Sequence, residues 1–146
     1  MYIKQFRLPD AYEESVREQV GDWIKMGVVQ PSLSKYNSPI FAVKKKDGNI
    51  RLVQDFRALN ERTFPDKYSM RDIQDCLDEV GKSNSKVFST IDLTSGFWQM
   101  ALKPSCRPYT AFTVYGMGQY EFVTSPMGLL GCPASFQRLM EAVMKG

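Results

Sequence analysis

The sequence predicts an α+β fold, and two kinds of pattern support this prediction. Apolar residues recur at helical spacing in residues 10–26 and again from Pro133 onward. Runs rich in β-branched and aromatic residues occupy residues 40–56 and 109–124, and a short turn with glycine divides each run, which is typical of an antiparallel hairpin. With 43% hydrophobic and 24% charged residues, the 146-residue chain has the composition of one globular domain.

Composition removes several classes of function. The chain has no histidine, which excludes Ser-His-Asp and Cys-His catalysis and histidine-ligated zinc. Cys76, Cys106 and Cys132 show no paired spacing, so we expect free, buried thiols and neither a disulfide framework nor a zinc site. No apolar run could span a bilayer, and the first residues lack the apolar core of a signal peptide. We therefore expect an intracellular protein, cytoplasmic or nuclear, with no membrane partner.

Positive charge is concentrated in one segment. Residues 41–62 contain six cations and three anions, an excess that equals the net charge of +3 for the whole chain. Such a local basic surface favours a polyanionic partner. A solvated charged hairpin is the commoner explanation for a run of this kind, and the sequence leaves both interpretations open.

The first expected element is a helix over residues 10–26. Asp10 is its expected cap, Glu13 is the capping-box partner, and Gly27 ends it. Its apolar face consists of Val16, Val20, Trp23 and Ile24. Residues 29–39 hold two prolines, three serines and an asparagine, which predicts a surface loop.

The clearest hairpin follows. Residues 40–46 and 49–56 are its expected strands, and Asp47-Gly48 supplies the residues that tolerate positive φ in a tight turn. Lysines flank the tip, so this hairpin could carry cations over a phosphate. It could equally be an edge hairpin that lysines protect from aggregation.

A second helix is expected within residues 66–81, with Ser69 as its cap, Asp72 at the third position and Gly81 at its end. Three further strands are expected at residues 99–103, 109–114 and 119–124. The last helix has Pro133 at its first position. Its expected buried face consists of Phe136, Leu139, Met140 and Val143.

Residues 87–92 are predicted to form a core strand, because Val87, Phe88 and Ile91 favour a half-buried extended backbone. This strand would end in Asp92, directly before Thr-Ser-Gly. A carboxylate at a sheet edge beside free backbone N–H groups suits a metal ion and a phosphate. The alternative is that Asp92 only caps the helical turn after it.

The order of these motifs resembles the amino-terminal half of a reverse transcriptase, an RNA-directed DNA polymerase, most closely those of gypsy-type long-terminal-repeat retrotransposons. The resemblance covers nearly the whole chain. It depends on five blocks: residues 36–39 (YNSP), 43–48 (VKKKDG), 51–60 (from Arg51 through DFRALN), 88–97 (from Phe88 through DLTSGF) and 125–137 (SPMGL with PASFQ).

The resemblance implies a role for each residue around Asp92. Asp92 would be the first metal-binding carboxylate and a catalytic residue, holding Mg²⁺ in the complete enzyme, with the carbonyl of Leu93 as a further ligand. The N–H groups of Ser95 and Gly96 would face the triphosphate. Phe97 would lie under the nucleotide sugar and exclude a 2′-hydroxyl group.

Further nucleotide contacts are implied on the hairpin and near the last helix. Lys45 resembles the lysine that reaches the γ-phosphate, although Lys44 or Lys46 would take its place if the register slips by one. Arg51 resembles the arginine that lies over the base and contacts the α-phosphate. Met127 stands on the sugar side of the pocket, where many retroviral relatives have glutamine. The residues implied near the template are Asp55, Arg57 and Asn60.

The sequence departs from the family pattern in what it lacks. The other two metal carboxylates belong to a Tyr-x-Asp-Asp turn, and no Asp-Asp dipeptide occurs in the chain. We therefore expect the isolated chain to be catalytically inactive, without the thumb, RNase H and integrase of a polyprotein. We also expect marginal stability or self-association, because the strand that ends in Asp92 would have an open edge.

The resemblance also implies a division of the chain and a set of partners. Residues 1–64 and 101–131 would form the fingers, and residues 65–100 and 132–146 part of the palm. The expected partners are an RNA or DNA template with its primer and deoxynucleoside triphosphates. The alternative function is a co-opted, non-catalytic module that binds nucleic acid or protein through the basic hairpin.

Overall fold

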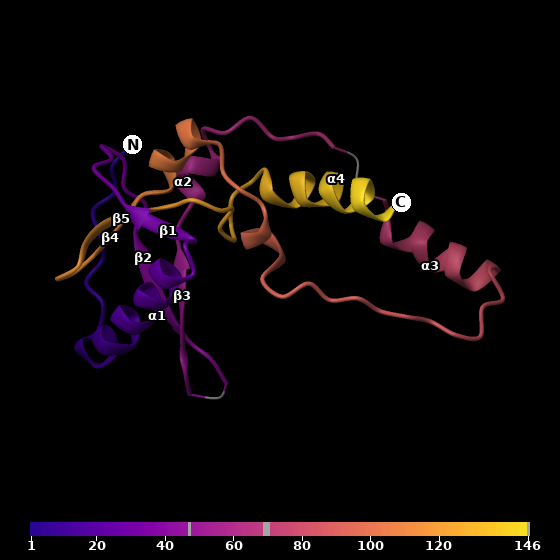
Figure 1. The fold of residues 1–146 in the computed structure, drawn as a ribbon, viewed down its shortest axis with the longest axis horizontal. Coiled ribbons are helices and arrows are strands. Elements are labelled where there is room, and N and C mark those ends of the chain that lie inside the picture. Colours follow the sequence, from indigo (N-terminus) through magenta and orange to yellow (C-terminus); the bar gives the residue numbers. More distant parts are fainter. Residues whose placement is uncertain (47, 69–70, 146) are drawn as a thin grey trace.

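The computed structural model describes residues 1–46, 48–68 and 71–145, and it confirms the predicted α+β class. Helices and short antiparallel sheets alternate along the chain (Figure 1). The elements are η1 (Asp10–Tyr12), α1 (Glu13–Lys25), β1 (Val29–Pro31), β2 (Ile40–Lys44), β3 (Ile50–Gln54), α2 (Arg57–Asn60), α3 (Ile73–Lys82), η2 (Gly96–Gln99), η3 (Pro104–Thr110), β4 (Phe112–Val114), β5 (Gly118–Phe122) and α4 (Cys132–Met144). None of the helices in these ranges is long and apolar enough to cross a membrane.

Two antiparallel sheets form the centre of the fold. β2 and β3 make the predicted basic hairpin, with Ile40 opposite Gln54 and Lys44 opposite Ile50. Its expected turn includes Asp47, which lies outside the described residues. The second hairpin, β4 and β5, gains β1 as a third strand in the order β1-β5-β4. The expectation of a loop throughout residues 29–39 was therefore wrong for β1.

The core lies between α1 and the two sheets. Val16 and Val20 of α1 and Phe112 of β4 are fully buried there. Trp23 packs against Phe112 and Phe122, with ring centroids 6.2 and 5.6 Å apart. Figure 1 shows α3 and α4 extending to one side of this core, with α4 beginning close to it and α3 reached by long segments. Ile24, predicted on the apolar face of the first helix, is exposed.

The predicted core strand at residues 87–92 is not formed. These residues have no strand partner among the described residues, and Val87 and Ile91 are 84% and 77% exposed. The β-branched residues favour an extended backbone, but an extended segment becomes a strand only when a neighbour takes its backbone hydrogen bonds. The strand expected at residues 99–103 is reduced to a single bridge between Ala101 and Thr124.

Both predicted helix caps differ in the structure. Asp10 caps no helix and instead pairs with Arg7 at 3.4 Å on the surface. Ser69 lies outside the described residues, and Asp72 caps α3 by accepting a hydrogen bond of 2.7 Å from the N–H of Gln74. The expected stop at Gly81 is also wrong, since α3 continues to Lys82.

Burial was predicted too widely in the last helix and at the cysteines. On α4, Leu139 and Val143 are exposed, and the buried residues Cys132 and Ala134 lie in its first turn. Among the cysteines only Cys132 is buried, whereas Cys76 and Cys106 are exposed. The exposure of Leu139, Val143 and Cys76 arises because α3 and the far part of α4 lie away from the core, whereas Cys106 is exposed in η3. The short helix α2 was not predicted.

Candidate functional site

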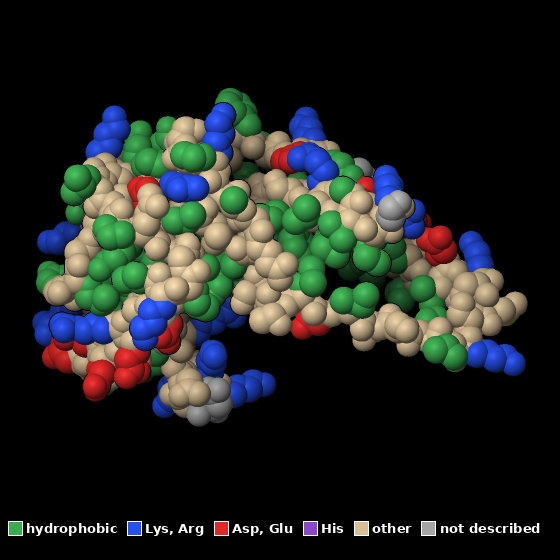
Figure 2. Space-filling view, viewed as in Figure 1, with side chains coloured by type: hydrophobic (Ala, Val, Ile, Leu, Met, Phe, Trp, Pro, Cys, Tyr) green, Lys and Arg blue, Asp and Glu red, His purple; other side chains and the backbone are tan. Residues whose placement is uncertain are grey.

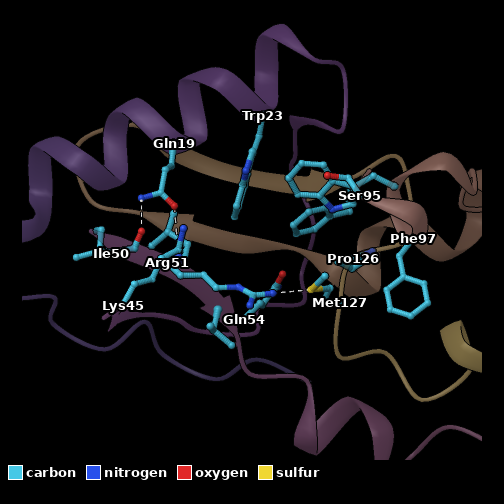
Figure 3. A pocket seen from close by; sticks show the side chains of 14 residues that line it. Gln19, Trp23, Lys45, Ile50, Arg51, Gln54, Ser95, Phe97, Pro126 and Met127 are labelled. Carbon is cyan, nitrogen blue, oxygen red and sulfur yellow. Dashed lines mark hydrogen bonds between the residues drawn. The ribbon is translucent and has the colours of Figure 1, made fainter. Parts of the chain in front are cut away.

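A cavity of about 410 Å³ brings together residues from distant parts of the sequence (Figure 3). Five of its lining residues were predicted to bind nucleotide: Lys45, Arg51, Ser95, Phe97 and Met127. The rest of the lining consists of Gln19, Trp23, Ile50, Leu52, Val53, Gln54, Trp98, Phe122 and Pro126. The cavity is thus built from α1, the β2–β3 hairpin, the turn with η2, the end of β5 and the loop before α4.

Arg51 is the cation that reaches across the cavity. It lies on β3, where it is exposed, and its Nη2 donates a hydrogen bond of 2.6 Å to Sδ of Met127 (Figure 3). A thioether is a weak acceptor, so this contact holds the guanidinium without neutralising its charge. Arg51 therefore stays able to bind an anion.

Aromatic rings form one wall of the cavity. Trp23 from α1 and Trp98 from η2 meet edge to face, with ring centroids 5.8 Å apart. Trp23 also contacts Phe122 of β5 at 5.6 Å. These two tryptophans are the only ones in the sequence, so both indoles lie at the cavity.

The turn before η2 has a constrained backbone. Ser95 has φ of 50°, in the left-handed region that few residues other than glycine adopt. Gly96 follows with its Cα against the ring of Phe136, because an added Cβ would lie 2.9 Å from Cζ of that ring. Phe136 in turn packs edge to face on Phe97 at 5.3 Å. Close packing with α4 is thus one reason for glycine at residue 96.

Asp92, the predicted catalytic residue, lies on the surface. Its side chain is exposed and is not part of the cavity lining. It also makes no cap, since the residue before η2 is Ser95 and no side chain caps that helix. The alternative that Asp92 only caps the next turn is therefore wrong. Leu93, beside it, is half-buried.

The three residues predicted near the template make contacts within the chain. Arg57 donates two hydrogen bonds to the carboxylate of Asp55, at 2.9 and 2.7 Å. These hydrogen bonds lower the pKa of Asp55. Asn60 joins α2 to the loop before α4 by donating to the carbonyl of Gly128 at 2.8 Å and accepting from the N–H of Leu130 at 3.0 Å. None of the three lines the cavity.

Comparison with known proteins identifies the family. The family model described as reverse transcriptase (RNA-dependent DNA polymerase) matches residues 43–146, which is more than half of the chain. This chain belongs to the reverse transcriptase family. The Pol polyproteins of the Drosophila melanogaster transposons gypsy and opus are 43% and 40% identical to it, each over 99% of its length. The reverse transcriptase chain spans only 14% and 15% of those polyproteins.

Solved structures of reverse transcriptases have the same fold. A foamy viral protease-reverse transcriptase in complex with an RNA/DNA hybrid superposes with a TM-score of 0.81 and is 28% identical. Its counterpart in complex with double-stranded DNA has a TM-score of 0.80. The matches cover 99% of this chain and 19% and 30% of those chains. The resemblance predicted from the five sequence blocks is thereby confirmed.

The described residues of this reverse transcriptase chain do not by themselves fit a divalent metal ion. No group of three or more acidic or cysteine side chains gathers within residues 1–46, 48–68 and 71–145. Asp92 and the carbonyl of Leu93 would supply at most three oxygens, whereas Mg²⁺ takes six ligands in a nearly octahedral arrangement. Asp92 and Leu93 alone therefore do not make a complete Mg²⁺ site.

Nine of the lining residues were not predicted as site residues, among them Gln19, Gln54 and Trp23. Gln19 and Gln54 had no assigned role, and Trp23 was expected only to pack in the core. Gln54 donates to the carbonyl of Thr110 at 2.8 Å, which ties β3 to η3. No local signal identifies these roles, because the contacts that tie the residues into the site join segments far apart in the sequence, such as Gln19 with Ile50 and Gln54 with Thr110.

Proposed function

We propose that this chain forms the nucleotide-binding side of an RNA-directed DNA polymerase, which extends a primer on an RNA or DNA template with deoxynucleotides. The single observation that supports this most directly is the cavity that Lys45, Arg51, Ser95, Phe97 and Met127 share. They come from four separate sequence blocks of the family pattern, two of which form the hairpin. If the hairpin served only as a basic surface, it would not need Ser95, Phe97 and Met127 beside it in one cavity.

The chemistry of the lining suits a nucleoside triphosphate. Lys45 offers a compact point charge and Arg51 a planar fork, so the two cations can bind different phosphates. The ring of Phe97, held by Phe136, would stand where it crowds a 2′-hydroxyl group. We propose that this arrangement makes the site prefer deoxynucleotides.

The division into fingers and partial palm is part of the same proposal. Apart from Cys132 and Ala134, the buried apolar core residues lie within residues 1–64 and 101–131, which supports treating these two ranges as one unit. Mg²⁺ would supply activation of the primer hydroxyl and neutralisation of phosphate charge when bound in the complete enzyme. Asp92 would be one of its ligands. With a single carboxylate available, we expect this chain alone to bind nucleotide without transferring it.

Tryptophan fluorescence tests the proposal directly, because both tryptophans line the cavity. A deoxynucleoside triphosphate titrated into the chain should change this fluorescence with saturation. Arg51→Ala and Lys45→Ala should each weaken binding about tenfold or more, as expected for a lost hydrogen bond to a charged group. Lys35→Ala is the matched control, since it removes one surface cation outside the cavity and should leave affinity unchanged.

The sugar contact has its own test. Phe97→Val should raise affinity for a ribonucleoside triphosphate relative to its deoxy counterpart, because it removes the crowding ring. Equal affinities for both sugars in the parent chain, or no saturable signal with either, would count against the proposed site.

The lysine-rich tip of the hairpin favours one second candidate, a non-catalytic module that binds nucleic acid. Lys44, Lys45 and Lys46 are all exposed, and Figure 2 shows cations gathered where this tip projects from the molecule. If a primer-template binds through these lysines, its association constant should fall as salt rises. The fall should be about tenfold per phosphate contact for each tenfold increase in salt concentration. Salt-sensitive duplex binding without any nucleotide binding would favour this candidate.

A further inference from the structure

The side chain of Gln19 occupies the free edge of β3. From α1 its Nε2 donates to the carbonyl of Ile50 at 3.2 Å, and its Oε1 accepts from the N–H of Leu52 at 3.4 Å (Figure 3). The residue between these two contacts is Arg51. One carboxamide thus bridges the backbone groups on either side of the arginine that we propose binds nucleotide.

The register of the hairpin explains why these groups are available. The N–H of Lys45 donates to the carbonyl of Asn49 at 2.7 Å, and that of Asp55 donates to Pro39 at 2.9 Å. In an antiparallel pair of strands, the residues whose backbone groups bond to the other strand alternate with residues whose backbone groups point away. The backbone N–H and C=O groups of Arg51 therefore face β2, and those of Ile50 and Leu52 face outward. Gln19 contacts the outward groups as a peptide of an adjacent parallel strand would.

This contact connects the strand that carries Arg51 to the buried face of α1. Val16 and Val20, on either side of Gln19 in α1, are 1% and 0% exposed in the core. The hairpin itself has only two strands, and an isolated two-stranded sheet is marginally stable in water. The side chain of Arg51 is exposed, so its position depends on how firmly its backbone is held.

We propose that Gln19 is a positioning residue: it fixes the backbone of β3 so that Arg51 is held ready for the nucleotide phosphates. This inference rests on the proposed function of Arg51. It assigns no direct contact with nucleotide to Gln19.

Gln5 provides a matched control on the opposite edge of the same hairpin. Its Nε2 donates to the carbonyl of Ile40 at 2.7 Å, and its Oε1 accepts from the N–H of Ile40 at 2.9 Å. Ile40 pairs with Gln54, at the end of the hairpin away from Arg51. Gln5 is therefore an edge contact of the same kind that does not flank the arginine.

The experiment compares Gln19→Met with Gln5→Met by tryptophan fluorescence and urea unfolding. Both variants should lose a similar amount of stability. Only Gln19→Met should weaken binding of a deoxynucleoside triphosphate, about fivefold. Combined with Arg51→Ala, it should cause no further loss, because its effect passes through that arginine.

A conservative variant and a hydrogen-exchange measurement separate positioning from folding. Gln19→Glu retains an acceptor for the N–H of Leu52 but loses the donor to Ile50, so its affinity should lie between those of the parent and Gln19→Met. The Leu52 amide should exchange faster in Gln19→Met and at the parent rate in Gln5→Met. If Gln19→Met does not fold, the test uses Gln19→Glu instead: its nucleotide affinity and the exchange rate of its Leu52 amide then decide whether Gln19 positions β3.

The outcomes distinguish this inference from the function on which it rests. If Arg51→Ala weakens binding but neither Gln19 variant does, the positioning role is wrong and the proposed function stands. The positioning role would also be overturned if Gln19→Met weakened nucleotide binding by the same factor in the parent chain and in the Arg51→Ala variant. If Arg51→Ala itself leaves affinity unchanged, both proposals fail.

Discussion

Gly96→Ala is expected to loosen the contact between the turn of the proposed nucleotide site and α4. The added Cβ would lie 2.9 Å from Cζ and 3.2 Å from Cε2 of Phe136. Ordinary contacts with a Cβ begin near 3.4 Å, so the ring must move by about 0.5 Å. The ring is not free to do so without cost, because it packs edge to face on Phe97 at 5.3 Å.

The size of the effect follows from two opposing contributions. Overpacking costs about 1–3 kcal/mol, and a disturbed aromatic pair adds about 0.5–1.5 kcal/mol. Replacing glycine by alanine lowers the entropy of the unfolded chain, which returns about 0.4–1 kcal/mol where φ is negative, as it is at Gly96. We therefore expect the free energy of unfolding to fall by about 1–3 kcal/mol.

Urea unfolding followed by tryptophan fluorescence measures this change, because Trp23 and Trp98 pack beside the core. Gly21→Ala is the control, because Gly21 lies within α1 with no atom within 4 Å of an added Cβ, and it should stabilise the chain by about 0.5–1 kcal/mol. Phe136→Leu should reduce the penalty by removing the atoms that clash. The reasoning would be refuted if Gly96→Ala were as stable as the parent. It would also be refuted if Gly96→Ala cost as much stability in a Phe136→Leu background as in the parent.

Three further predictions concern the core, the thiols and a polar contact. Phe112→Ala removes a fully buried ring and should lower the free energy of unfolding by about 3–5 kcal/mol in the same urea assay, unlike a surface change such as Lys35→Ala. Burial raises the pKa of the Cys132 thiol, so a thiol reagent should modify Cys76 and Cys106 quickly and Cys132 slowly; three equal rates would contradict this. The hydroxyl of Tyr68 donates to Glu141 at 2.5 Å, and this hydrogen bond lowers the pKa of the Glu141 carboxyl. The hydrogen bond therefore stabilises the folded chain at neutral pH, and this stabilisation is lost as pH falls through the lowered pKa. Tyr68→Phe should therefore destabilise the chain at neutral pH but not in strong acid, as measured by thermal unfolding at both.

Local signals in the sequence predicted the parts of the fold that depend on near neighbours. Alternation and the Asp47-Gly48 signal predicted the hairpin of β2 and β3 correctly. Its register was wrong by one residue, because a two-residue turn would place Lys46 opposite Asn49, whereas Lys45 donates to Asn49 and Lys44 lies opposite Ile50. Gly27 ends the first helix as expected, with φ of 70°.

Elements that depend on distant partners were predicted less well. Residues 87–92 have the propensity of a strand, yet propensity supplies no neighbouring strand. The burial expected for Leu139 and Val143 failed for a related reason, because periodicity identifies an apolar face without showing what covers it.

The candidate site shows the same contrast. Motif order brought Lys45, Arg51 and Phe97 into one hypothesis, and the three do line one cavity. Their roles toward a nucleotide remain predictions. Gln19 could not be found in this way, because a glutamine on a helix is ordinary until the edge of β3 is placed beside it.

The exposure of α3 affects how the unfolding of this chain has to be measured. No residue of this ten-residue helix is buried, and helices of that length are marginal in water without packing. Its circular dichroism signal should fade gradually on heating, whereas the two tryptophans beside the core report the cooperative loss of tertiary packing. Because the two probes follow different regions, their transitions should not coincide, and a single melting temperature does not describe the whole chain.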